Sequence, residues 1–271
     1  MKVLFTGLVF FLFLMNSRDG RATVKPENKK SHKIGLNTGL YNFGSIDELY
    51  SFARYSGQGM SYGFKLWDGH SNKNHLLSLR YAMIQRHPNG LQLDTNYFAV
   101  TDPNLVKNSF MFEAIDHYRY LIKSVSNQYI KLYGEGVWLT SVNITTNANS
   151  LPELIQSGVG AGLYSTANLR KHQFSAEIHV PLVTLTVRNS YSMSLTQNYE
   201  KLSKLAFIRQ NDQLQFPNSL LALNTTLEYE YAISKQLSVS GEYNLRLMLN
   251  TSPRPLRSIN SIYSMNLLFK Y

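Results

Sequence analysis

The sequence predicts an all-β protein: one transmembrane, antiparallel, up-and-down β-barrel in which ten strands are favoured and twelve are the alternative. Three observations predict it. The chain begins with an export signal. Its later stretches alternate apolar and polar residues. Along the chain, short connections between these stretches mostly alternate with longer ones. No later stretch is apolar over the roughly 20 residues that a membrane-spanning helix needs. If the mature chain enters a membrane, it therefore does so as strands.

The export signal occupies residues 1–22. Lys2 supplies the positive start, Val3 to Met15 form an apolar run, and Gly20 and Ala22 are the small residues of a cleavage site. We expect cleavage near Ala22. The mature chain then divides into an N-terminal segment, residues 23–58, and the barrel, residues 59–271.

Charge and cysteine content restrict the partners and cofactors. The formal net charge is +10, and loss of residues 1–22 removes three cationic and one anionic side chain, which leaves about +8. For an exported chain we expect this charge to attract outer-membrane lipid and lipopolysaccharide, and not nucleic acid. The chain has no cysteine, which excludes disulfides, a lipid-modified cysteine and thiolate metal sites. We expect no cofactor and no metal.

Ten stretches alternate apolar and polar residues in the manner of strands. They are Met60 to Leu66, His75 to Ile84, Leu91 to Ala99, Ser109 to Leu121, Tyr129 to Ser141, Gly158 to Ser165, Lys171 to Val187, Ser219 to Tyr231, Leu237 to Met248 and Ser258 to Tyr271.

Two further segments precede these stretches. Ile34 to Phe43 resembles a strand and would join the barrel only with a second new strand, which gives the alternative of twelve. Ser45 and Glu48 have capping-box spacing, with apolar residues following at helical intervals, so a short helix is expected there.

The alternation is clearest from Leu237 to Leu247, where every second residue from Leu237 is apolar or glycine and those between are polar. Pairing Tyr231 with Leu237 aligns the two faces of this stretch with those of the preceding one. One face is expected to meet hydrocarbon and the other water.

Connection lengths predict which end of the barrel is which, because outer-membrane barrels have short periplasmic turns and longer external loops. The expected periplasmic turns are Gln85 to Gly90, Ile122 to Gln128, Thr166 to Arg170 and Ala232 to Gln236. The expected external loops are Trp67 to Asn74, Val100 to Asn108, Val142 to Gln156, Arg188 to Asn218 and Leu249 to Arg257.

The C-terminal stretch, Ser261 to Tyr271, is large and apolar at every second position and ends on an aromatic residue: Tyr263, Met265, Leu267, Phe269 and Tyr271. In this and in its export signal, the chain resembles the outer-membrane β-barrel proteins of Gram-negative bacteria. The resemblance implies that the terminal strand is an assembly signal. It implies as partners the barrel-assembly machinery and periplasmic chaperones. Phenylalanine is the usual last residue of that family, so Tyr271 is a departure.

Polar residues on the water-facing side are the candidate functional groups. Glu113, His117 and Arg119 share one face of a stretch, and Glu228, Glu230, Glu242 and Arg246 form a second polar group; Arg80 stands alone. Paired carboxylates can serve as acid and base in hydrolysis. Inside a narrow barrel, ion pairs that fill the lumen are the simpler interpretation.

A second candidate lies in the stretch Trp67 to His75. It resembles the histidine and serine motif of outer-membrane phospholipases and lipid A deacylases, in which the histidine activates the serine. Here His70 and Ser71 are adjacent, so the family's spacing is not kept, and a polar turn is the simpler interpretation.

These observations favour a non-enzymatic, integral outer-membrane protein that is a narrow, porin-like channel or a surface-binding barrel. An outer-membrane lipid hydrolase that uses His70 and Ser71 is one alternative. A soluble, secreted β-sandwich is another, and it would pack the apolar side chains in a dry core.

Overall fold

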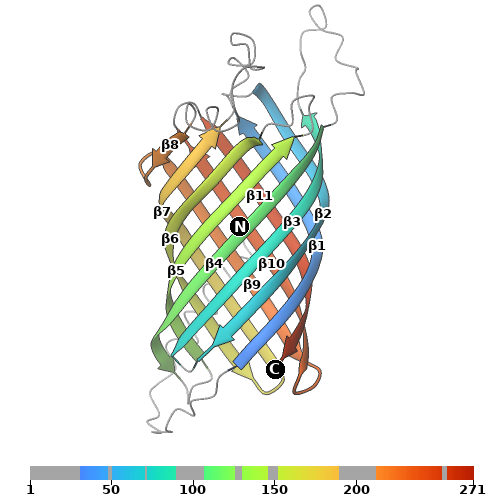
Figure 1. Cartoon of the computed structure of the whole chain (residues 1–271), viewed down its shortest axis with the longest axis vertical. Helices are drawn as coiled ribbons and strands as arrows, with labels where there is room; N and C mark the ends of the chain where they lie inside the picture. Colours follow the sequence, from blue (N-terminus) through green and yellow to red (C-terminus); the bar gives the residue numbers. More distant parts are fainter. Residues whose placement is uncertain are drawn as a thin grey trace, which may run out of the picture.

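The computed structural model describes residues 31–47, 51–70, 72–89, 107–125, 130–145, 152–188, 212–251 and 255–271. In these ranges the chain is almost entirely strand (Figure 1). No helix among the described residues is long and apolar enough to cross a membrane. The strands are β1 Ser31–Asp47, β2 Ser51–Gly69, β3 Lys73–Asn89, β4 Lys107–Val125, β5 Ile130–Thr145, β6 Pro152–Leu169, β7 His172–Arg188, β8 Asp212–Gln215, β9 Leu220–Ala232, β10 Leu237–Asn250 and β11 Leu256–Lys270.

Ten of these strands close into one antiparallel barrel, as the sequence predicts. The order is β6-β5-β4-β3-β2-β1-β11-β10-β9-β7, and the pairing of β6 with β7 completes the ring. The short β8 pairs only with the last part of β7. The strands are strongly tilted against the long axis of the barrel (Figure 1), as closure of a sheet requires.

The barrel has two different ends. At one of them, here called the turn end, β1 begins and β11 finishes, and the short connections 70–72, 126–129, 170–171 and 233–236 join the strands. The other, here called the loop end, carries the connections 48–50, 90–106, 146–151, 189–219 and 251–255, which include the two longest. The two longest connections thus lie at the end opposite the one that holds Tyr271.

Side chains alternate between the outer surface and the barrel interior along every strand. On β11, Met265 is 65% exposed and its neighbour Asn266 is 1% exposed. The apolar positions of the terminal stretch, Tyr263, Met265, Leu267, Phe269 and Tyr271, are all exposed. The predicted outward apolar face is therefore confirmed, and no dry sandwich core holds these residues.

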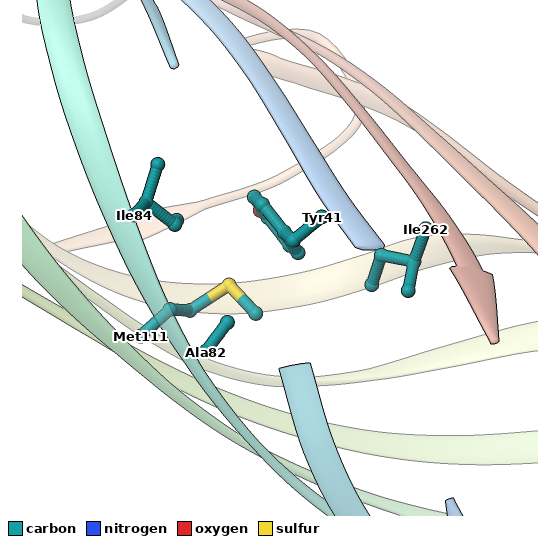
Figure 2. Packing of buried hydrophobic residues seen from close by; sticks show 5 residues of the cluster. All are labelled: Tyr41, Ala82, Ile84, Met111 and Ile262. Carbon is teal, nitrogen blue, oxygen red and sulfur yellow. The ribbon is translucent and has the colours of Figure 1, made fainter. Parts of the chain in front are cut away.

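The interior is divided into an apolar and a charged region. In the half nearer the loop end, Tyr41, Ala82, Ile84, Met111 and Ile262 pack together inside the barrel (Figure 2). A second interior cluster, formed by Leu220, Ala222, Met248 and Leu256, lies close to the loop end, with Leu154 packed against it. Most of the charged interior side chains lie nearer the turn end.

The predicted set of strands is partly wrong. β1 and the first part of β2 occupy residues 31–58, so the barrel begins well before residue 59 and no separate N-terminal segment covers this range. Ile34 to Phe43 is part of β1, and the barrel still has ten strands because β3 pairs directly with β4, for example Met83 with Phe110. The predicted strand Leu91 to Ala99 lies outside the described residues.

The predicted short helix is also wrong within the described residues. Ser45 and Ile46 belong to β1 and pair on both sides, Ser45 with Ser258 and with Tyr55. Backbone pairing in a closed barrel thus overrides a local capping pattern, whose helix preference is weak.

Because Leu91 to Ala99 is predicted as a barrel strand, two connections are predicted at the wrong end of the barrel. Trp67 to Asn74 lies at the turn end, and Gln85 to Gly90 follows the strand direction of β3 to the loop end. The other predicted turns, and the loops from Val100 onward, fall at the expected ends. The register of β9 on β10 is shifted by two residues from the predicted one, because Tyr231 pairs with Val239 and not with Leu237. Such a shift preserves both faces.

Candidate functional site in the barrel interior

The interior ionisable groups come from strands that are far apart in sequence. Strand alternation directs inward the residues Glu113, His117, Arg119, Glu230, Glu242 and Arg246, all buried, and Glu228, which is partly buried. Lys33, Lys65, Arg80, Glu135, Glu177 and His179 are also buried in the interior. Buried charges must be paired, since an isolated one costs several kcal/mol (about 3 or more).

The largest group, here called the Arg119 cluster, comprises Arg119, His117, Glu135, Glu177 and His179. Arg119 Nε donates to Glu135 Oε1 at 2.6 Å, and its Nη2 donates to Glu177 Oε2. His117 Nδ1 lies 2.8 Å from Glu135 Oε1, and His179 Nδ1 lies 3.0 Å from Glu177 Oε1. The cluster links β4, β5 and β7, so one guanidinium holds three strands together from inside.

Aromatic rings surround the guanidinium of Arg119. Its central carbon lies 3.7 Å from the ring centre of Tyr164 and 5.4 Å from that of Trp67. A planar guanidinium stacks well on such rings. Arg119 is 1% exposed, and this packing explains how so large a cation is accommodated away from water.

A second group, here called the Glu242 cluster, joins opposite walls. Glu242 on β10 accepts hydrogen bonds from Lys65 Nζ on β2 and, at 3.1 Å, from Arg80 Nη2 on β3. The prediction that Arg80 stands alone is therefore wrong. Glu228 lies directly opposite Glu242 in the β9–β10 register and accepts a hydrogen bond from Ser240 Oγ at 2.6 Å.

The ion pair of Arg246 and Glu113 joins two strands that lie opposite each other in the barrel. β10 and β4 are five steps apart in either direction around the ten-strand ring. Arg246 Nη2 nevertheless donates to Glu113 Oε1 at 2.8 Å, and its Nε donates to Asn224 Oδ1 at 2.7 Å. The lumen at this level is therefore crossed by one salt bridge.

Near the turn end, Glu230 accepts hydrogen bonds from two lysines. Lys33 Nζ and Lys270 Nζ each lie 2.8 Å from one of its oxygens, and Ser238 Oγ donates at 2.7 Å. Lys33 is at the start of β1 and Lys270 at the end of β11. This carboxylate therefore lies across the junction where the first and last strands meet.

The spaces between these groups are small. A cavity of about 40 Å³ lies beside the Arg119 and Glu242 clusters, and one of about 60 Å³ lies nearer the loop end, beside Tyr41, Met111 and Arg246. Cavities of this size hold a few water molecules. Arg119 and Glu242 line the first cavity, and Arg246 lines the second.

One group within the Arg119 cluster has the composition of a metal site. A nitrogen of His117 and one carboxylate oxygen each of Glu135 and Glu177 lie within 4.8 Å of one another. Histidine and carboxylate ligands suit zinc. The guanidinium of Arg119 already bonds both carboxylates, so the charge that a metal would supply is present, and we interpret the group as an ion-pair network.

Of the predicted pair His70 and Ser71, the structure places His70 at the turn end, after the last residue of β2. His70 is exposed and its backbone N–H donates to the carbonyl oxygen of Lys73 at 2.7 Å, which closes a tight turn. Ser71 lies outside the described residues. The nearby His75 is on β3, where its Nε2 contacts Asp116 on the outer surface.

No protein-family model matches the chain, and no curated protein sequence matches it. Among solved structures, the outer membrane protease OmpT from Escherichia coli matches 93% of this chain and 99% of its own, at 6% identity and a TM-score of 0.47. The translocator domain of autotransporter NalP from Neisseria meningitidis covers 100% and 96%, at 7% identity and a TM-score of 0.41. An outer membrane channel from Pseudomonas putida F1 covers 93% and 100%, with the same identity and score.

At these identities and scores no residue role or activity is transferred to this chain. The fold stands on the chain's own geometry, which combines a closed ten-strand barrel, an apolar outer face and a polar interior. These are the properties of an outer-membrane β-barrel protein.

Proposed function

We propose that this barrel is a closed scaffold in the outer membrane of a Gram-negative cell, and that its loop end is a surface for binding other molecules. The observation that carries the proposal is the salt bridge between Arg246 and Glu113, which spans the lumen between opposite strands. The Arg119 and Glu242 clusters occupy the levels of the lumen nearer the turn end. A continuous water path would require the crossing pair of Arg246 and Glu113 to separate.

The proposal includes the export route. In this route the signal is cleaved near Ala22 and periplasmic chaperones escort the chain. The barrel-assembly machinery then inserts it, and the barrel contacts outer-membrane lipid and lipopolysaccharide. The signal pattern of residues 1–22 and the outward aromatic stripe of β11 support this route.

Planar-bilayer recording tests the closed lumen. We expect the purified, refolded protein to give no steady single-channel steps. The double variant Glu113→Ala/Arg246→Ala removes both members of the crossing pair without leaving an unpaired charge, and we expect it to conduct. Lys235→Ala, in the exposed turn before β10, is the matched control and should stay silent. Steady conductance by the unaltered protein would instead establish a narrow channel.

The narrow channel is the second candidate function. It is favoured by the cavities of about 40 and 60 Å³ at successive levels of the interior. The lipid-hydrolase alternative depends on His70 and Ser71, whose exposed turn offers His70 no oriented carboxylate among the described contacts. This alternative remains a prediction. A lipid-hydrolysis assay on Ser71→Ala would test it, because undiminished activity would exclude Ser71 as the nucleophile.

The assembly signal gives a separate prediction. Phe269→Ser/Tyr271→Ser should lower the amount of heat-modifiable, membrane-inserted barrel in cells several-fold, while the same variant still refolds in detergent. Leu237→Ser is the matched control, because Leu237 pairs with Phe269 but lies outside the terminal strand. If the control lowers assembly in cells equally, the residues act through lipid contact and not as a signal.

A further inference from the structure

The wall of the barrel is incomplete beside β7. This strand pairs with β9 only from His172 to His179, and with β8 only from Thr184 to Val187. Between these pairings, residues Val180 to Val183 have no strand partner on that side within the described ranges. Pro181 has no backbone N–H to offer a neighbour. We call this interruption, formed by 180–183 of β7 and 220–223 of β9, the β7–β9 gap.

On its other side β7 is held closely against β6. A β-carbon placed on Gly158 would lie 2.3 Å from the carbonyl oxygen of Val183, and one on Gly160 would lie 2.5 Å from that of Val180. Only glycine permits this approach. The pairing also shifts between Val159 and Gly160, which is a β-bulge. The close contact with β6 fixes β7 at the gap and leaves β9 without its partner there.

A mostly apolar cavity of about 30 Å³ lies at the gap. Its apolar lining includes the interior residues Leu220, Ala222 and Met248, and also Val159, which is on the outer face. The polar side chains that line it are Gln156, His179, Thr184, Asn224 and Arg246. Leu220, Ala222 and Met248 belong to the interior cluster near the loop end. The cavity thus extends from that cluster into the wall, where Pro181 of β7 also lines it.

The outer mouth of the gap is part of the lipid-facing surface. Val180, Leu182 and Leu221 are exposed there, and Phe216 lies exposed in the turn between β8 and β9. Hydrocarbon from the bilayer is in contact with these side chains in a membrane-inserted barrel.

We propose that the β7–β9 gap is a lateral binding site for the hydrocarbon end of a membrane lipid. An unbranched acyl chain enters between β7 and β9 and places its methyl end against Leu220 and Met248. The apolar part of the lining and its position beside the lipid-facing surface select this occupant. Arg246 of the crossing pair and His179 of the Arg119 cluster line the same cavity, but the occupant enters through the wall and not along the lumen.

Fluorescence quenching by phospholipids with brominated acyl chains tests the proposal. The native tryptophans are replaced by phenylalanine at Trp67 and Trp138, and one tryptophan is introduced by Met248→Trp. In brominated vesicles we expect its quenching to approach that of Leu182→Trp, on the outer face. Met111→Trp is the matched interior control from the first apolar cluster, and it should be quenched at least twofold less than Met248→Trp.

Two further measurements keep the outcome unambiguous. Ala222→Phe should fill the cavity and lower the quenching at position 248 at least twofold, and heat-modifiable migration verifies that each variant is folded. If Met248→Trp does not fold, Leu220→Trp replaces it. Equal quenching at positions 248 and 111 would overturn the proposal. So would strong quenching at 248 by aqueous iodide with none by brominated lipid, because the gap would then admit water.

Discussion

Replacing Arg119 by methionine is expected to destabilise the barrel by about 3 to 5 kcal/mol. The change leaves the carboxylates of Glu135 and Glu177 buried without their cation, and their side chains are only 0% and 6% exposed. Methionine preserves much of the packing against Tyr164, so the loss measures mainly the missing charge. Urea-induced unfolding in lipid vesicles, followed by tryptophan fluorescence, gives the free energy of unfolding.

Arg170→Met in the exposed turn between β6 and β7 is the matched control, with an expected effect of at most about 0.5 kcal/mol. The triple variant Arg119→Met/Glu135→Gln/Glu177→Gln should recover part of the loss, because it buries no unpaired charge. A cost below about 1 kcal/mol for Arg119→Met would contradict the network described here, since the two carboxylates would then need no cation.

Leu79→Arg is expected to lower the free energy of unfolding by about 2 to 4 kcal/mol, the cost of an arginine on the lipid face near the bilayer centre. Leu79 lies near the middle of β3 and is exposed on the outer surface. The same unfolding experiment in vesicles gives this value.

Two controls separate charge from size and depth. Leu79→Phe keeps the position apolar and should change the free energy by less than about 1 kcal/mol. Lys73→Glu alters the charge at the turn end, where the cost falls to about 0 to 1 kcal/mol. If Leu79→Arg is as mild as Lys73→Glu, the outer face of β3 does not meet hydrocarbon.

The in–out arrangement of the strands could be predicted from the sequence because side-chain direction alternates strictly along a strand. Residues Leu237 to Leu247 gave both faces of β10 correctly, and Tyr263 to Tyr271 gave those of β11. The register of β9 on β10 could not be predicted, because a shift by two residues preserves every face. What fixes it is the turn at 233–236, where Ser234 Oγ accepts hydrogen bonds from the backbone N–H groups of Gln236 and Leu237.

The choice of strands was harder to predict than their number. Leu91 to Ala99 alternates about as well as Ile34 to Phe43, which carries glycines at positions 35 and 39. Only the pairing of β1 with both β2 and β11 shows that the earlier segment belongs to the barrel. That pairing joins opposite ends of the sequence and leaves no local signal.

For the candidate site, the inward position of Glu113, Arg119 and Glu242 follows from alternation, but their partners do not. Glu242 is bonded by Lys65 and Arg80, which precede it by 177 and 162 positions. Lys65 lies between two apolar residues of a predicted strand, so its inward direction was available from the pattern. Which charges meet across the lumen depends on strand tilt and stagger, which the pattern of residues does not contain.

The pairing of β1 with β11 constrains how the protein reaches its native state. Lys33 is opposite Lys270, and Asp47 is opposite Leu256, so this ladder joins the first and the last strand of the barrel. Contacts between such distant positions are slow to establish, because the intervening chain must first be ordered. Until then β1 and β11 are both free edges that can pair with other molecules. Closure of the barrel therefore ends an aggregation-prone stage, and its timing depends on the meeting of the first and last strands.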